Sequence, residues 1–259
     1  MRFSTLSLAF LFFAAGIILV SCKKNSGEVL STNDYTDAVI PDNAAGALYA
    51  VRTVTYRRND MGSYDTTYTS QARAWFGSRT NTKTTSLVRI NVDTLAPGTI
   101  TVNNKSYNWY QTNPLNHLNF FVGGGNTIYW RVFEDSVNQI PNMDIMDNGQ
   151  FGNLLLTSIP DSVTMGQPIK AVFKYLNPGS TATDQLMFMA KGSLGNVGWP
   201  ISLTSTTESI STRELARITV PGDSVIVTIM PAKIRTEDVG FGKYYFVKES
   251  AVSKVVKIY

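Results

Sequence analysis

Residues 48–76, LYAVRTVTYRRNDMGSYDTTYTSQARAWF, contain two stretches of β-forming residues separated by a turn. The first stretch, Leu48 to Tyr56, is rich in β-branched and aromatic residues, which favour strands. Arg57 to Gly62 has the composition of a turn, and Ser63 to Phe76 returns as a long second strand whose side chains alternate between two faces. These residues therefore predict a β-hairpin, and the same kind of pattern continues to the end of the chain.

Short strands and turns recur through the remaining sequence. Val88, Ile90 and Val92 alternate with polar residues, a turn at Ala96-Pro97-Gly98 follows, and Ser211 to Val220 has the composition of a mixed strand. No apolar stripe with helical spacing lasts three turns, so we expect no long helix. The predicted fold class is all-β, with two tandem antiparallel β-sandwich domains.

A break in the pattern suggests where these domains meet. Residues 135–153 interrupt the alternation with Pro, Asn and Gly, so the boundary is placed near Leu154. The first sandwich is predicted to span residues 45–153 and the second residues 154–259. Each half then has about 110 residues, a usual size for one sandwich.

The composition of the 259-residue chain excludes several classes of protein. Apolar residues make up 43% and charged residues 16%, which suits folded domains with real cores. A single cysteine excludes an internal disulfide framework, and a single histidine, His117, excludes His-rich metal centres. The net charge of +4 is too small to indicate a nucleic-acid partner. We therefore expect no nucleic-acid binding and no cofactor.

The first 21 residues have the features of a targeting signal. Arg2 is their only charge, and Leu6 to Val20 is an apolar run shorter than the roughly 20 residues that span a bilayer. Leu19-Val20-Ser21-Cys22 ends the run and resembles the lipobox of bacterial lipoproteins. The resemblance implies that residues 1–21 are a lipoprotein signal peptide, cleaved before Cys22, and that a diacylglycerol is attached to the Cys22 sulfur. The alternative is an ordinary secretory signal or an uncleaved anchor.

Acylation of Cys22 implies a membrane-lipid partner, since two or three acyl chains anchor a protein stably whereas one holds it only marginally. By analogy with lipoproteins, Lys23 after the cysteine favours the outer membrane of the cell envelope, with the leaflet and the oligomeric state left open. Residues 22–44 lack periodic patterning and are predicted to form a flexible, lipid-anchored tether. The alternative there is a short edge strand that includes Tyr35, Val39 and Ile40.

The second predicted domain also resembles the immunoglobulin-like fold. The resemblance rests on the order of P-D-S-V at 160–163, G-Q-P at 166–168, D-S-V-I-V-T-I at 223–229 and G-K-Y-Y-F-V at 242–247. The first half, with G-T-I-T-V-N-N-K-S-Y at 98–107 and Y-W-R-V-F at 129–133, resembles a recurrent module of Bacteroidetes-type envelope lipoproteins. Neither resemblance implies a known activity.

Aromatic residues are the most suggestive candidates for ligand binding. Tyr107, Trp109 and Tyr110 lie in a stretch rich in Asn, Gln and Thr, and Trp75 shares a predicted strand face with Gln71. Rings flanked by amides and hydroxyls can stack on a sugar and hydrogen-bond its hydroxyl groups. The alternative is that Trp109, together with Trp130, is a core aromatic residue of its sandwich.

Carboxylates offer a second, different function. Asp144 and Asp147 are the best-placed pair for a glycosidase, which needs two carboxyl groups and no histidine. A calcium site at the same pair is a weak alternative, because Met146 occupies a donor position of the EF-hand pattern.

Taken together, these features lead us to expect a non-catalytic binding or structural role, with a glycan or an envelope protein as the partner. The alternative is a carboxylate-dependent glycan hydrolase that uses the Asp144/Asp147 region.

Overall fold

The structure is a computed structural model that describes residues 38–41, 43–77, 86–102, 105–112, 127–147, 151–152, 154–175, 184–240 and 242–259. These residues are mostly β-strands with one short helix, so the predicted all-β class is confirmed. No helix among them is long and apolar enough to cross a membrane. The immunoglobulin-like character of residues 154–259 stays a prediction.

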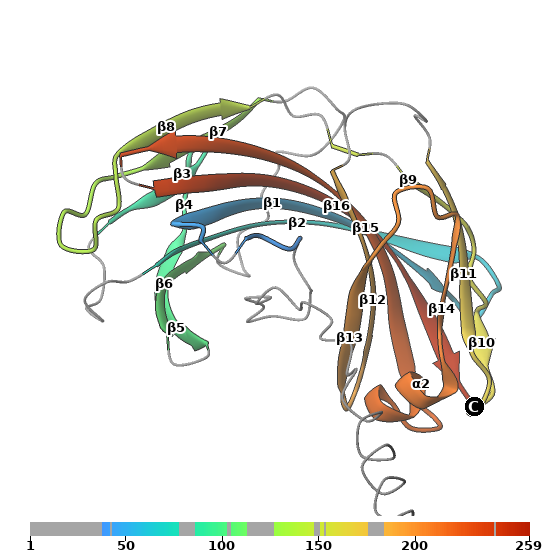
Figure 1. The fold of residues 1–259 in the computed structure, drawn as a ribbon. Helices are drawn as coiled ribbons and strands as arrows, with labels where there is room; N and C mark the ends of the chain where they lie inside the picture. Colours follow the sequence, from blue (N-terminus) through green and yellow to red (C-terminus); the bar gives the residue numbers. More distant parts are fainter. Residues whose placement is uncertain are drawn as a thin grey trace, which may run out of the picture.

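One long sheet runs through the whole molecule. Its strands are β1 (Gly46–Arg58), β2 (Tyr64–Gly77), β5 (Ala96–Val102), β6 (Lys105–Gln111), β10 (Ser162–Val163), β12 (Gln185–Gly192), β13 (Gly195–Ile201), β15 (Ser224–Val239) and β16 (Gly242–Ile258). Their order is β13-β12-β15-β16-β1-β2-β6-β5, and β10 pairs with β16 off this path. Figure 1 shows that the sheet bends into an arch, with one end horizontal and the other vertical in this view.

Two smaller sheets cover the outer side of the arch, one at each end (Figure 1). The first contains β3 (Val88–Ile90), β4 (Asp93–Thr94), β7 (Ile128–Val132) and β8 (Met143–Asp147), in the order β4-β3-β7-β8. The second contains β9 (Leu154–Ser158), β11 (Ile169–Tyr175) and β14 (Thr207–Ile210), in the order β14-β11-β9. Each end of the molecule is therefore a two-layer sandwich, as the strand pattern predicted.

The two sandwiches share the long sheet as a common layer. Strand β16 is 17 residues long, and on one side it pairs antiparallel with β15, which has 16 residues. On its other side, residues 244–254 pair in parallel with residues 46–56 of β1, so a strand of the first half lies beside a strand of the second. The boundary predicted near Leu154 thus separates the two smaller sheets but does not divide the long one.

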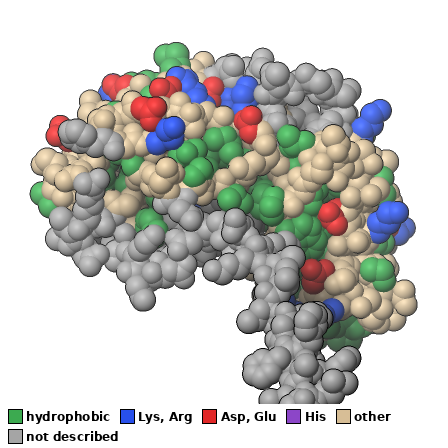
Figure 2. Space-filling view, viewed as in Figure 1, with side chains coloured by type: hydrophobic (Ala, Val, Ile, Leu, Met, Phe, Trp, Pro, Cys, Tyr) green, Lys and Arg blue, Asp and Glu red, His purple; other side chains and the backbone are tan. Residues whose placement is uncertain are grey.

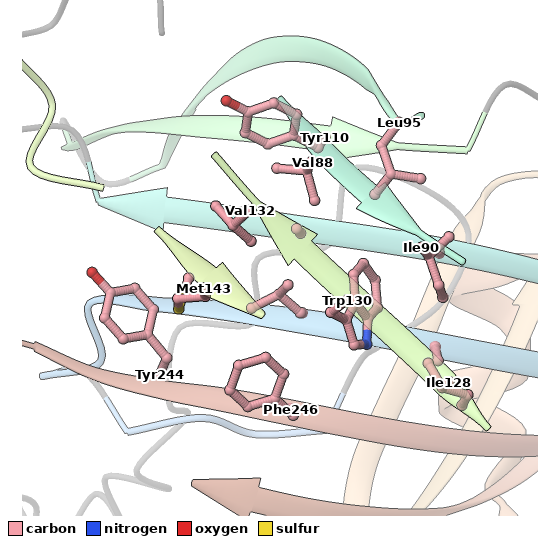
Figure 3. Close-up of a cluster of buried hydrophobic side chains, with 14 of the residues drawn as sticks. Val88, Ile90, Leu95, Tyr110, Ile128, Trp130, Val132, Met143, Tyr244 and Phe246 are labelled. Carbon is pink, nitrogen blue, oxygen red and sulfur yellow. The ribbon is translucent and has the colours of Figure 1, made fainter. Parts of the chain in front are cut away.

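The first core lies between the sheet β4-β3-β7-β8 and one end of the long sheet (Figure 3). The smaller sheet contributes the buried side chains of Val88, Ile90, Ile128, Trp130, Val132 and Met143. The long sheet contributes alternate residues of its strands, such as Leu48 and Ala50 of β1 and Tyr244 and Phe246 of β16. This alternation is the period-2 pattern on which the sequence prediction rested.

The second core lies between the sheet β14-β11-β9 and the other end of the long sheet. Phe188 of β12, Ile229 of β15 and Val256 of β16 pack there with Phe173 of β11, and none of the four is more than 1% exposed. Val256 follows Phe246 by an even number of residues along one continuous strand, so both cores lie on the same, outer face of the long sheet.

The helix α2 (Thr212–Ile218) closes one end of the second core with its buried Leu215 and Ile218. The prediction of a mixed strand from Ser211 to Val220 is therefore wrong. Ser211 caps the helix in a capping box: its side chain accepts from the Glu214 N–H, and the Glu214 carboxylate accepts from the Ser211 N–H. This pairing satisfies N–H groups that a helix start leaves free, and it favours a helix over a strand here.

The inner face of the long sheet carries a third cluster. Trp75, Trp109 and Tyr245 pack there with Ala38 and Ile40, which are 3% and 6% exposed. The flexible tether predicted for residues 22–44 therefore does not extend over its last described residues, because apolar burial holds them against the sheet. These residues form no described strand, so the alternative of an edge strand at Val39 and Ile40 is not observed either.

Charged side chains lie on both faces of β16 at its centre, between the segments that contribute to the two outer cores. Lys248 points to the outer face, where its ammonium lies 3.0 Å from a carboxylate oxygen of Asp147. Glu249 points to the inner face, where it pairs with Arg73 at 3.4 Å and accepts a 2.7 Å hydrogen bond from the Ala38 N–H. The side chains of Arg73 and Glu249 are 2% and 0% exposed, and buried charges of this kind are retained only when they are paired.

Candidate functional site

The four predicted aromatic residues lie on two different faces of the long sheet. Trp75, Tyr107 and Trp109 share the inner face, where the rings of Trp75 and Tyr107 meet edge-to-face at 5.4 Å. Tyr110 points into the first outer core, is fully buried, and donates a hydrogen bond to the Ser86 carbonyl. Trp75 and Trp109 are only 6% and 5% exposed. The structure therefore does not present the four rings as one open sugar platform, because two faces of a pleated strand cannot contribute to one surface.

The predicted carboxylate pair is also divided. Asp144 and Asp147 are three residues apart on β8, so they point to opposite faces of that strand. Asp144 is exposed and pairs with Arg131 at 2.8 Å, and hydrogen bonds from Arg131 and then Tyr129 lower its pKa. Asp147 faces the long sheet and pairs with Lys248. A glycosidase needs two carboxyl groups that face each other, and these two point to opposite faces of β8.

In the part of the chain that the structure describes, no group of three or more His, Cys, Asp or Glu side chains could hold a metal ion. The predicted lipidation site, Cys22, lies outside the described residues, and so does His117.

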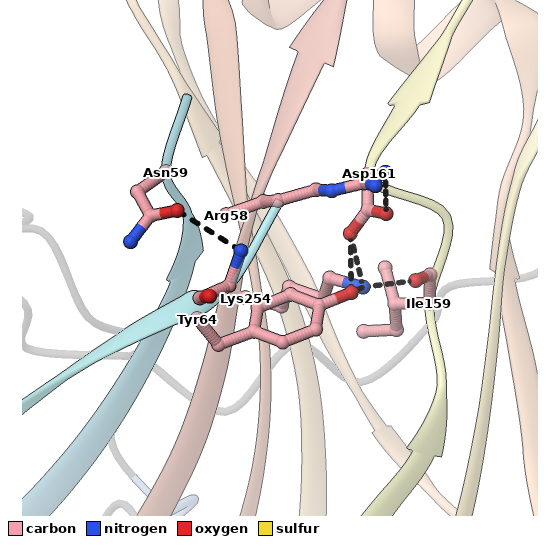
Figure 4. A network of polar contacts seen from close by, with 7 residues as sticks. Arg58, Asn59, Tyr64, Ile159, Asp161 and Lys254 are labelled. Carbon is pink, nitrogen blue, oxygen red and sulfur yellow. Dashed lines mark hydrogen bonds and ion pairs between the residues drawn. The ribbon is translucent and has the colours of Figure 1, made fainter. Parts of the chain in front are cut away.

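A different set of polar residues converges where the turn between β1 and β2 meets the start of β10 (Figure 4). Asp161 accepts hydrogen bonds from Arg58 at 2.8 Å and from the Tyr64 hydroxyl at 2.6 Å. The ammonium of Lys254, from β16, lies 2.8 Å from the same Asp161 carboxylate. Lys254 also donates to the Ile159 carbonyl at 2.5 Å and lies 4.9 Å from the centre of the Tyr64 ring. The carboxylate of Asp161 therefore joins three segments that are far apart in sequence.

Local sequence explains how these side chains reach one another. The β1–β2 turn is held by a hydrogen bond from the Asn59 N–H to the Ser63 carbonyl, so the two strand ends present Arg58 and Tyr64 side by side. Lys254 occupies a core-facing position between Val252 and Val256 in β16, and it is 8% exposed. Burial of a lysine is costly unless its charge is matched, and Asp161 provides the matching charge.

The electrostatics of this network favour an ionised carboxylate. The hydrogen bond from Lys254, followed by the one from Tyr64, lowers the pKa of Asp161 from 3.8 to about 2. Asp161 is therefore negatively charged at neutral pH, and it serves as an acceptor rather than as a proton donor.

A groove of about 660 Å³ opens beside this network, and we call it the hairpin groove. Its charged lining residues are three cations and three carboxylates, namely Arg57, Arg58, Lys257, Asp60, Asp65 and Asp161. Neutral polar groups come from Asn59, Ser162, Ser224 and Tyr259, and the last of these side chains is 65% exposed. The groove is thus electrically balanced and lined with both donors and acceptors, next to an exposed aromatic ring.

The sequence contained one signal for this site that the prediction did not use. In the final strand, Lys254 interrupts an alternating row of apolar residues at a position that the period of 2 assigns to the core. A lysine in such a position requires a carboxylate partner from elsewhere in the chain.

Comparison with protein-family models finds no match for this chain, and a search of the curated proteins finds none either. Among solved structures, the chain is similar to "Fcho1 Mu homology domain (Danio Rerio) with bound Eps15 peptide" at 11% sequence identity. The similarity covers 82% of this chain and 96% of that chain. The TM-score is 0.23, so the likeness is too weak to indicate a shared function.

Proposed function

We propose that this chain is a lipid-anchored cell-envelope protein with a non-catalytic role, and that it binds a neutral glycan in the hairpin groove. The observation that carries the glycan proposal is the balanced lining of three cations and three carboxylates beside the exposed ring of Tyr259. A net positive or negative groove would favour an oppositely charged ligand, whereas a balanced one favours a neutral molecule with many hydroxyl groups.

The lining residues provide the kinds of contact that a sugar requires. Carboxylates and amides such as Asp60 and Asn59 can accept from or donate to neighbouring hydroxyl groups, and Arg57 supplies several N–H donors. The ring of Tyr259 can pack against the apolar face of a pyranose. The network of Lys254 and Asp161 supports this arrangement, because it fixes the β1–β2 turn against β16.

A glycan array probed with the full chain tests the binding proposal. We expect bound glycans, and we expect Tyr259→Ala and Arg57→Ala to reduce their signal at least about tenfold, which corresponds to about 1.4 kcal/mol. Arg213→Ala, an exposed arginine on α2, is the matched control and should bind as the parent does. Absence of any bound glycan, or binding that both groove variants retain, would contradict the proposal.

Lipid anchoring at Cys22 is tested separately. The expected result is that the parent chain partitions into the detergent phase, whereas Cys22→Ser is soluble or accumulates as the uncleaved precursor. Equal partitioning of the two proteins would exclude acylation of Cys22 while leaving the glycan proposal unaffected.

A further inference from the structure

Among the described residues, half of strand β2 has no partner along one of its two hydrogen-bonding edges. On one side β2 pairs with β1 over its whole length, from Tyr64 opposite Arg58 to Phe76 opposite Gly46. On its other side β6 pairs only with residues 73–77, and Thr112 adds a contact with Ala72. Among the described residues, none pairs with the outer edge of β2 from residue 64 to residue 70.

The direction of the free backbone groups follows from Ala72. Its N–H donates to the Thr112 hydroxyl at 2.5 Å and its carbonyl accepts from the Thr112 N–H at 2.8 Å, so both groups of Ala72 point outward. Backbone groups alternate in direction along a strand, and the β1–β2 register is continuous without a bulge. Tyr64, Thr66, Tyr68 and Ser70 therefore direct their N–H and carbonyl groups away from β1.

The side chains of this edge do not protect it. Residues 64–69 are all exposed, and the Tyr68 side chain is 74% exposed. Five of the seven residues in YDTTYTS are tyrosine or threonine, which favour strands, and the segment has Asp65 as its single charge and no proline or lysine. Natural proteins usually block an open edge with lysine, proline or a bulge, and an edge without these features is ready to pair with another strand.

We propose that this edge pairs antiparallel with the same edge of a second copy of the chain, about a two-fold axis at Thr67. This register places Tyr64 opposite Ser70 and Thr66 opposite Tyr68, all four with outward-facing backbone groups. Each such pair exchanges two hydrogen bonds, so the dimer contains about eight. The long sheets of the two copies join into one continuous sheet.

Complementarity within the segment favours a second copy as the occupant. The proposed register places Asp65 opposite Thr69 and Thr67 opposite itself, so no like charges meet. On the other face, each Tyr68 lies beside a β-branched Thr66, a favourable cross-strand pair. The segment that can pair is also bounded on both sides. The N–H and carbonyl of Ala72 are already hydrogen-bonded to Thr112, and the β1–β2 turn ends the strand before Tyr64. A shift by two residues in either direction loses one pair.

Disulfide cross-linking of the full chain tests this geometry. In the proposed dimer, the two Thr67 residues form a non-hydrogen-bonded pair whose Cα atoms are about 4.5 Å apart. A disulfide can span that distance, so Thr67→Cys should yield a covalent dimer under mild oxidation. Thr69→Cys is the matched control, because Thr69 lies on the same face and is also exposed. Its two copies would be about 13 Å apart, beyond the reach of a disulfide.

The expected result is about tenfold more covalent dimer for Thr67→Cys than for Thr69→Cys, as the higher effective concentration of the facing thiols requires. The parent chain measures any background from Cys22. Adding Thr66→Pro to Thr67→Cys should abolish the dimer, because proline removes an outward N–H and leaves the bonds to β1 intact. No cross-link in Thr67→Cys, equal cross-linking of Thr69→Cys, or a dimer that survives Thr66→Pro would each overturn the proposal.

Discussion

Lys254 is the residue that holds together the polar network beside the β1–β2 turn. Its ammonium is almost fully buried and contacts the Asp161 carboxylate, the Tyr64 hydroxyl and the Ile159 carbonyl (Figure 4). When one partner of such a buried pair is removed, the remaining charge is left without compensation, which costs more than the pair itself contributes. The network therefore links the position of the β1–β2 turn to the ionisation of one carboxyl group.

Asp161→Asn should show this link in the pH dependence of stability. The pKa of Asp161 is about 2 in the folded protein and 3.8 ordinarily, so its charge stabilises the fold above about pH 4 and this contribution is lost as the pH falls toward 2. We expect the variant to be less stable than the parent at neutral pH and to lose less stability on acidification. Denaturant unfolding across this pH range measures both effects.

The matched control for this measurement is Asp60→Asn, which changes an exposed carboxylate on the neighbouring turn. Its free energy of unfolding should follow that of the parent at each pH. If Asp161→Asn has the same pH dependence as the parent, the proposed role of the Lys254–Asp161 pair is wrong.

Substitution of Trp109 tests whether the aromatic cluster on the inner face is a hydrophobic core. Because the side chain is only 5% exposed, Trp109→Ala should lower the free energy of unfolding by about 3–5 kcal/mol through lost burial and the cavity it leaves. Met61→Ala, which truncates an apolar side chain that is 88% exposed, should change it by no more than about 0.5 kcal/mol. A Trp109→Ala protein as stable as the parent would show that the ring does not belong to a stabilising core.

At the scale of elements, strands with clean alternation were predictable and the central part of β16 was not. The hairpin predicted from residues 48–76 corresponds to β1 and β2. Lys248, Glu249 and Ser250 are three polar residues in a row, which in a sequence resembles a break between two strands. In the structure these residues continue the strand, and ion pairs with Asp147 and Arg73 compensate their burial. Local periodicity contains no information about such distant partners.

Gly192 offers a test of how β12 and β13 pack against α2. A Cβ atom at this position would lie 2.1 Å from the Ile218 carbonyl oxygen at the end of the helix, so the backbone of one element would have to move. Gly192→Ala should therefore lower the free energy of unfolding by about 1–3 kcal/mol, as overpacking usually does. Gly98→Ala is the control, because its Cβ would lie an ordinary 3.8 Å from the nearest atom. Equal stabilities of the two variants in thermal unfolding would contradict this close approach.

At the scale of the whole molecule, the hairpin groove shows why the candidate site could not be predicted. Its lining comes from the β1–β2 turn, the start of β10, the start of β15 and the end of β16. These segments meet because β1 lies parallel to β16 at the centre of the long sheet. The sequence could indicate each strand, but it does not encode this pairing in any local pattern. Figure 2 shows one face of the molecule, with apolar side chains in the middle of the arch and charged ones along its upper side and on its vertical end.

The shared sheet makes a prediction about unfolding. Independent tandem domains would unfold in separate transitions, whereas β15 and β16 contribute to both cores, so loss of either core exposes strands of the other. We therefore expect the full chain to show one calorimetric transition whose van't Hoff and calorimetric enthalpies agree.

Ile90→Ala in the first core and Ile229→Ala in the second should each shift that one transition to lower temperature, since both residues are fully buried and each change costs about 2–5 kcal/mol. The control is Leu194→Ala, which truncates an apolar side chain that is 61% exposed, and it should leave the midpoint nearly unchanged. Two transitions, each shifted by only one of the core variants, would mean that the halves fold independently despite their common sheet. A single transition shifted by both variants would mean that β15 and β16 transmit the loss of one core to the other.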